Sequence, residues 1–132
     1  MKEIEVVAAI LIYQDKILCV QRGLNKFDYI SKKYEFPGGK MEKNESKAET
    51  IKREIWEELR MQIEPLSEFC TVEHRYPDFK IIMHGMICTC ENPTLELTEH
   101  LSYKWLNKNE LRGLDWAAAD LPIVENLINS SL

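Results

Sequence analysis

The sequence predicts one α/β (α+β) domain built on a mixed β-sheet, and three observations support that class. Its 132 residues have the usual size of a single domain, here residues 1–132. Runs of β-branched and apolar residues, typical of strands, occur near the N-terminus, in the middle and near the C-terminus. Two other segments have helical spacing. Because strands precede, separate and follow these helices, we expect helices packed against a mixed sheet.

The first elements are a hairpin, a loop and a short strand. Residues 4–12 and 17–20 are apolar and flank a turn at 14–16, which predicts a β-hairpin. Residues 23–33 are polar and irregular, and we interpret them as an exposed loop. Residues 34–40 are predicted to form a short strand broken by a Pro-Gly-Gly turn.

The pattern becomes helical over residues 45–61. Ala48, Ile51, Ile55 and Leu59 recur at steps of three and four, and they therefore form one apolar stripe. The remaining predicted elements are strands at 66–76 and 80–90 around a turn at 76–78, a strand at 101–106, a short helix at 107–112, and a helix at 123–128 that starts at 120–122.

Composition narrows the classes of function. The chain has 22 acidic and 17 basic residues, a net charge of −5 and a pI near 5.3, which argues against broad binding to nucleic acid. No apolar run is long enough for a transmembrane helix, and no secretory signal is visible at the N-terminus. We therefore expect a cytoplasmic protein with no membrane partner. The four cysteines lack the spacing of a zinc site and are expected to be reduced core thiols.

Three carboxylates share one side of the predicted helix. Glu54, Glu57 and Glu58 stand at i, i+3 and i+4, positions that lie on one face. This cluster is either a solvated acidic face or a site for Mg²⁺ or Mn²⁺, which accept carboxylate oxygens together with substrate phosphates. The glycine-rich segment 36–40, where backbone groups can approach a ligand closely, favours a site.

The same segment resembles the Nudix box, whose pattern is G-x5-E-x7-R-E-U-x-E-E-x-G-U, with U a bulky aliphatic residue. Gly39, Glu45 and the run 53–61 match this box over residues 39–61 at every specified position but one. The departure is Arg60, where the family has glycine, and it costs about 1 kcal/mol if the helix ends there with φ > 0. The tail 98–122 is similar to the CTP pyrophosphohydrolase branch of the MutT-type enzymes.

The resemblance implies the Nudix fold, an α/β/α sandwich with a central mixed sheet. It also implies that Glu54, Glu57 and Glu58 bind divalent cations, Mg²⁺ or Mn²⁺, with the Gly38 carbonyl as a further ligand.

Three more residues receive expected roles from the resemblance. Arg53 would orient the acids by ion pairing, and Glu45 would brace the loop before the helix. Glu99 is a candidate general base or fourth carboxylate ligand, and the alternative is an ordinary surface acid. The implied reaction is attack of water on a phosphorus of a nucleoside triphosphate, which releases a monophosphate and pyrophosphate.

The substrate contacts expected from the resemblance come from both acidic and basic residues. They are Arg22, Glu35, Lys40, Lys80 and Asp120. For Arg22, Lys40 and Lys80 the alternative is a surface base without a role. For Asp120 the favoured alternative is a helix N-cap, since Pro122 suits an early helical position.

Base preference depends on Ala117. MutT-type enzymes that act on 8-oxo-guanine nucleotides have an asparagine at the position of Ala117, and this asparagine hydrogen-bonds the purine. An alanine side chain has neither a hydrogen-bond donor nor an acceptor. A preference for CTP, dCTP or modified pyrimidine nucleotides is therefore expected, with 8-oxo-dGTP as the alternative and a non-catalytic nucleotide-binding module as a second.

His74, His84 and His100 lack metal-ligand spacing and are expected to be structural or solvent-facing. The chain is expected to be a monomer or homodimer.

Overall fold

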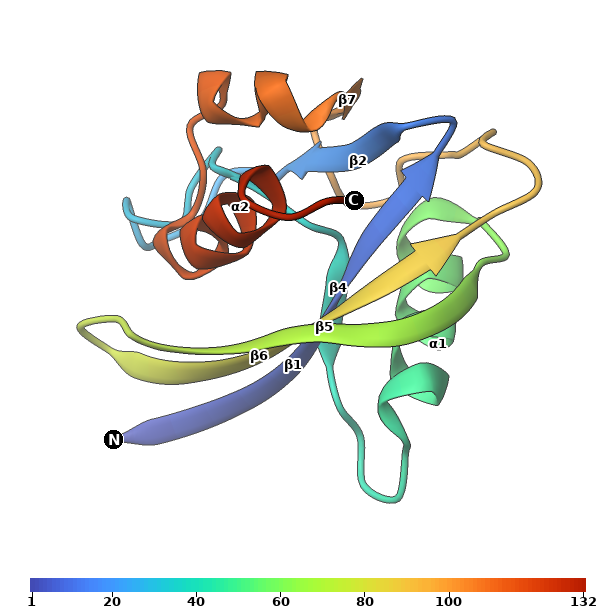
Figure 1. Ribbon diagram of the computed structural model, residues 1–132. Helices are drawn as coiled ribbons and strands as arrows, with labels where there is room; N and C mark the ends of the chain where they lie inside the picture. Colours follow the sequence, from blue (N-terminus) through green and yellow to red (C-terminus); the bar gives the residue numbers. More distant parts are fainter.

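A computed structural model describes residues 1–132 as a seven-stranded sheet with helices on both faces (Figure 1). The strand order is β3-β2-β1-β6-β5, with β4 paired to β1 and β7 paired to β2. The pairing of β1 with β6 is parallel and the others are antiparallel, so the predicted mixed sheet is confirmed. The elements are β1 (Lys2–Tyr13), β2 (Lys16–Gln21), β3 (Tyr34–Glu35), β4 (Gly38–Lys40), α1 (Lys47–Leu59), β5 (Glu64–Arg75), β6 (Phe79–Thr89), β7 (Ser102–Leu106), two 3-10 helices (Lys108–Gly113 and Ala118–Asp120) and α2 (Leu121–Ile128).

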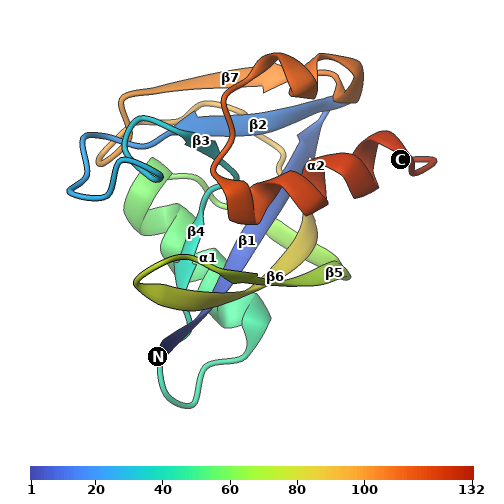
Figure 2. The same cartoon turned by 90° about the vertical axis from the view of Figure 1, so that its left-hand side faces the viewer.

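The two α-helices cover opposite faces of the sheet, which gives the predicted α/β/α sandwich (Figure 2). Alternate residues of β1 point to opposite faces. Val7 and Leu11 pack with the apolar stripe of α1, whereas Ala8 and Ile10 pack with α2. β1 therefore contributes to two separate hydrophobic cores.

Local chemistry accounts for the hairpin of β1 and β2. Gln14 and Asp15 have positive φ angles of 49° and 66°. A two-residue turn with positive φ at both positions matches the right-handed twist of the strands it joins. The predicted hairpin is confirmed, with the β2 side beginning at Lys16.

Helix α1 has a clear start and a clear end. Ser46 and Glu49 form a capping box, in which each side chain accepts a hydrogen bond from the other residue's backbone N–H. The stripe residues Ile51 and Ile55 are fully buried. The helix ends at Leu59 because Arg60 adopts the left-handed conformation, with φ 53° and ψ 35°.

Replacing Arg60 by glycine is expected to stabilise the protein by about 0.5 kcal/mol, because glycine removes the steric cost of positive φ. The gain is small because Arg60 also stacks on Trp56, with its guanidinium carbon 5.7 Å from the ring centroid. Thermal unfolding followed by circular dichroism measures the change. Arg60→Ala is the control, since it loses the stacking but keeps the strain, and it should lower the melting temperature. A lower melting temperature for Arg60→Gly would contradict this explanation.

The expected Pro-Gly-Gly turn is wrong. Gly38 and Gly39 lie in β4, which pairs antiparallel with β1. A Cβ on Gly38 would collide with the carbonyl oxygen of Val7, so the missing side chain allows close strand pairing rather than a reversal of the chain.

The cysteines are mostly buried, with Cys70 only partly so, and the helices are short. All four cysteines are free, and burial raises the pKa of the Cys19 and Cys88 thiols to about 12. Neither α-helix combines the length and the apolar composition that crossing a membrane requires.

Candidate active site

The carboxylates of α1 lie in different environments although they share one side of the helix. Glu58 is 3% exposed. The Glu54 side chain is largely buried, and the Glu57 side chain is half exposed. Glu54 packs so closely on β4 that a Cβ at Gly39 would collide with its carboxylate. The glycine-rich segment therefore gives the acid cluster direct access to the backbone of β4.

Arg53 is at the centre of an ion-pair network. Its guanidinium donates to both oxygens of Glu45, at 2.7 and 2.9 Å, and to Glu54 Oε1 at 2.9 Å. It also lies 3.3 Å from Glu57 Oε2 and donates to the Lys40 carbonyl at 3.1 Å. Arg53 thus connects two acids of the cluster to the loop that leads into α1.

Glu58 has the most perturbed electrostatics of the cluster. Burial, followed by the negative charges of Glu35, Glu54 and Glu99, raises the pKa of its carboxyl to about 10. Its Oε2 atom is buried and has no hydrogen-bond partner. A buried carboxylate oxygen without a partner, surrounded by further acids, fits a hard divalent cation such as Mg²⁺.

The donor set present is therefore compatible with a cation held by Glu54, Glu57 and Glu58, although the side chains do not form a preassembled ligand shell. Arg53 occupies oxygens of Glu54 and Glu57 instead. Glu99 is exposed, and its charge reaches Glu58. The Gly38 carbonyl remains a predicted ligand, located on β4 next to α1.

His100 is the site residue that the sequence reasoning missed. Its side chain is 5% exposed, and Nε2 lies 3.0 Å from Glu35 Oε2 and 3.6 Å from Glu58 Oε1. Of the two expected settings, structural or solvent-facing, the structure shows a buried ring, and this ring lies between two acids of the site. Only its position directly after Glu99 could have drawn attention to it.

A cavity of about 490 Å³ adjoins the acid cluster. Four of the five expected substrate contacts line it, namely Arg22, Glu35, Lys40 and Asp120. Apolar side chains, among them Phe27, Tyr76 and Phe79, form much of the remaining wall. The cavity thus combines a few polar groups with aromatic surface, as is common in ligand sites.

Lys80 is the expected contact that the fold does not bring to this cavity. Its neighbours Phe79 and Ile81 line the cavity, and successive strand residues point to opposite faces. Lys80 instead pairs with Glu73 at 2.8 Å and lies 3.8 Å from Glu3.

The favoured N-cap interpretation of Asp120 is wrong. Its side chain makes no capping hydrogen bond to α2, and Oδ1 instead accepts from the Phe36 backbone N–H at 3.0 Å. Burial, followed by the charge of Glu35, raises the pKa of this carboxyl well above its ordinary value. Asp120 joins the start of α2 to the end of β3 and forms a polar wall of the cavity.

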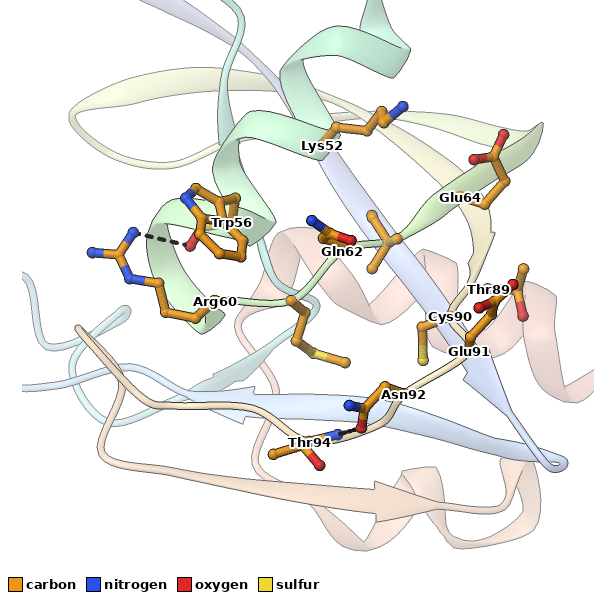
Figure 3. A pocket seen from close by; sticks show the side chains of 12 residues that line it. Lys52, Trp56, Arg60, Gln62, Glu64, Thr89, Cys90, Glu91, Asn92 and Thr94 are labelled. Atoms are coloured by element: carbon orange, nitrogen blue, oxygen red, sulfur yellow. Dashed lines mark hydrogen bonds between the residues drawn. The ribbon is translucent and has the colours of Figure 1, made fainter.

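A larger hollow of about 990 Å³ lies away from these residues (Figure 3). It lies between the end of α1 and the segment after β6, and Trp56, Arg60, Cys90 and Asn92 are among its lining residues. None of the expected site residues lines it.

Comparisons with known proteins identify the family. The protein-family model described as NUDIX domain matches residues 3–127, so the chain belongs to the Nudix family and is a Nudix hydrolase. A relative named CTP pyrophosphohydrolase, from Escherichia coli (strain K12), is 34% identical over 126 residues, which are 95% of this chain and 91% of that protein. A relative named 8-oxo-dGTP diphosphatase, from Buchnera aphidicola subsp. Schizaphis graminum, is 28% identical over 96% of this chain and 95% of that protein.

A solved structure agrees with both the fold and the family. The solution structure of the DNA mismatch repair protein MutT (family Nudix hydrolase) from methicillin-resistant Staphylococcus aureus 252 has a TM-score of 0.74 to this chain at 39% identity. The match covers 97% of this chain and 98% of that one.

The stability of the metal-free protein is expected to fall as the pH rises from about 6 to about 9. Glu58 keeps its proton in the folded state up to a pKa of about 10 but loses it near 4.5 when unfolded, so rising pH favours unfolding. Asp120 acts in the same direction. Added Mg²⁺ should raise the melting temperature more at the higher pH, because the cation then replaces the proton. Differential scanning calorimetry with and without Mg²⁺ measures both effects. A melting temperature that rises with pH in EDTA would contradict this assignment.

Proposed function

We propose that this Nudix hydrolase converts nucleoside triphosphates to the monophosphate and pyrophosphate, with a preference for CTP, dCTP or modified pyrimidine nucleotides. The observation that carries the proposal is the adjacency of the acid cluster and the cavity. Glu35 and Gly39 line the cavity, Glu35 is joined through His100 to Glu58, and Gly39 adjoins Glu54. A nucleotide can therefore place its base in the cavity and its phosphates beside the acids.

The acidic and basic residues of the site have different roles toward the triphosphate. Glu54, Glu57 and Glu58 hold Mg²⁺ or Mn²⁺, with Glu99 and the Gly38 carbonyl as further ligands. A bound divalent cation neutralises phosphate charge and lowers the pKa of the attacking water. Arg53 holds two of the acids in place, which matters because small misplacements of reacting groups slow catalysis strongly.

Substrate orientation depends on the polar groups of the cavity. Arg22 and Lys40 line it and supply positive charge for the phosphates, whereas Lys80 lies outside the cavity and pairs with Glu73. Glu35 and Asp120 provide the oxygen atoms available to a base. Because positive charge is gathered at this site, a protein with a net negative charge can bind a polyanion there.

The pyrimidine preference is supported by Asp120 and Ala117. Burial raises the pKa of the Asp120 carboxyl, and in its protonated form this group offers one donor and one acceptor side by side. This pair complements cytosine, whose N3 accepts and whose N4 amino group donates. Ala117 lines the cavity without a hydrogen-bonding side chain. The relative named CTP pyrophosphohydrolase supports the same preference.

An 8-oxo-dGTP diphosphatase is the second candidate, supported by the relatives of that name. An ionised Asp120 would present two acceptors, which suit the N1–H and N2–H groups of a guanine base. Base choice therefore depends on the protonation state of one buried acid.

We also place the activity in the cytoplasm, on free nucleotides rather than nucleic acid or membranes, in a single domain that acts as a monomer or homodimer. The net charge of −5 supports the exclusion of nucleic acid. A non-catalytic role would leave the complete set of box acids without a purpose.

The test follows hydrolysis with Mg²⁺ by separating the nucleotide products, with CTP, dCTP, 5-methyl-dCTP, 8-oxo-dGTP, ADP-ribose and a diadenosine polyphosphate as substrates, and it is run beside Glu57→Gln. Pyrophosphate is the expected second product of the triphosphates only. Fastest turnover of cytidine nucleotides, with little activity in the variant, supports the proposal. Fastest turnover of 8-oxo-dGTP overturns the pyrimidine preference. No turnover of any compound supports a nucleotide-binding module.

A further inference from the structure

Hydrogen bonds made by residues just before and just after His100 in the sequence hold this residue in place. Two residues before it, the Thr98 hydroxyl donates to the Glu57 and Glu58 carbonyls at 2.9 and 2.8 Å. One residue after it, the Leu101 N–H donates to the Gln21 carbonyl at 2.9 Å. The segment thus satisfies free carbonyls at the C-terminal end of α1 and is also attached to β2.

The imidazole ring lies between the cavity and the acid cluster. Because a carboxylate oxygen can only accept, the hydrogen bond at 3.0 Å requires that Nε2–H of His100 donates to Glu35 Oε2. The other oxygen of Glu35 is 3.4 Å from Arg22 Nη1, inside the cavity. The same nitrogen lies 3.6 Å from Glu58 Oε1, which is a close contact but longer than a hydrogen bond, and Oε2 of Glu58 has no partner and is available to a cation.

A second buried histidine shows what a purely structural arrangement looks like in this fold. His84 has partners at both ring nitrogens, with Glu5 Oε2 2.6 Å from Nε2 and Thr71 Oγ1 3.1 Å from Nδ1. His100, by contrast, leaves Nδ1 buried without a partner. Native proteins satisfy nearly all buried polar atoms, so the exception points to a task other than filling the core.

We infer that His100 is a positioning residue for cation binding, which holds Glu58 at a fixed orientation relative to the cavity residue Glu35. The inference rests on the proposed cation-dependent hydrolysis and assigns it a residue outside the Nudix box. Without the ring nitrogen, the Glu58 carboxylate loses its fixed neighbour and turns away from the orientation in which Oε2 is free. Groups that orient metal ligands in this way commonly change metal affinity by about 10- to 100-fold.

Two variants that differ by one methylene group separate positioning from folding. In His100→Gln the amide nitrogen reaches about the position of Nε2, whereas in His100→Asn it reaches only that of Nδ1. Mn²⁺ binding to the nucleotide-free protein, measured by electron paramagnetic resonance, should weaken about tenfold in His100→Asn and be largely restored in His100→Gln. His84→Asn is the matched control and should bind Mn²⁺ like the unmodified protein.

A kinetic measurement gives a second test, because loss of a merely structural residue would not change the Mg²⁺ dependence of the reaction. In His100→Asn the Mg²⁺ concentration for half-maximal pyrophosphate release should rise about tenfold, and excess Mg²⁺ should restore most of kcat. Unchanged Mn²⁺ affinity in His100→Asn, or equal loss in His100→Gln and His100→Asn, would overturn the positioning role. Because Mn²⁺ binding requires no nucleotide, this outcome is distinguishable from failure of the proposed substrate preference.

Discussion

Replacing Glu58 by glutamine is expected to reduce pyrophosphate release about 1000-fold while the protein stays folded. The amide keeps the shape of the side chain but cannot supply the charge that a divalent cation requires. Folding tolerates the change because burial and the neighbouring acids raise the pKa of the metal-free Glu58 carboxyl, so that the fold favours a neutral side chain at this position. Steady-state kinetics and thermal unfolding, each with and without Mg²⁺, measure the two effects.

The diagnostic result is the separation of activity from stability. Glu58→Gln should lose the rise in melting temperature that Mg²⁺ gives to the unmodified protein, and much of the pH dependence of its stability. Glu91→Gln, at an exposed acid outside the site, is the control and should behave like the unmodified protein. Near-normal hydrolysis by Glu58→Gln would remove Glu58 from the cation site.

Replacing Arg53 by alanine is expected to lower kcat about 100-fold, because Glu54 and Glu57 lose the guanidinium that holds them. The variant should also unfold at a higher pH during acid titration. Hydrogen bonds from Arg53 are the main reason that the pKa of Glu45 falls to about 2. A lowered pKa adds stability above the unfolded value of 4.5, and this stability is lost as the pH falls toward 2.

Arg112→Ala is the matched control for Arg53→Ala. Arg112 also binds a carboxylate through two nitrogens, at Glu125, but this exposed pair lies outside the site. Its loss should leave kcat unchanged and should move the acid midpoint less than Arg53→Ala does, because Arg112 also lowers the pKa of Glu125 but the pair is exposed to solvent. Arg53→Lys should resemble Arg53→Ala, because one ammonium cannot reproduce the planar, multiply donating guanidinium. Full activity in Arg53→Lys would show that charge alone suffices.

Features that depend on neighbouring residues were predictable from the sequence. The hairpin follows from a polar turn between two apolar runs, and α1 follows from the spacing of its apolar stripe. The cluster of Glu54, Glu57 and Glu58 follows from helical geometry alone, since positions three and four apart share a face. These predictions succeed because the physics that produces them acts within a few residues.

Predictions failed where a local rule competed with a distant partner. Asp120 before Pro122 has the pattern of an N-cap, yet its carboxyl bonds the N–H of Phe36, 84 positions away. Gly38 and Gly39 have the pattern of a turn, yet β1 takes them as a strand partner. In both cases burial against a remote segment outweighs the local preference, because a buried polar group or strand edge must find a partner somewhere.

The sequence by itself determined the family, most of the strands and helices, and the acids of the Nudix box, because these are recorded in short patterns. Only the tertiary structure decided which residues join that box to the cavity of about 490 Å³. Glu35, Glu58 and His100 are far apart in the chain and meet because β3, α1 and the segment before β7 pack together. The fold also left Lys80 outside the cavity through strand alternation. Such contacts depend on the packing of the whole sheet, and no local pattern of residues specifies them.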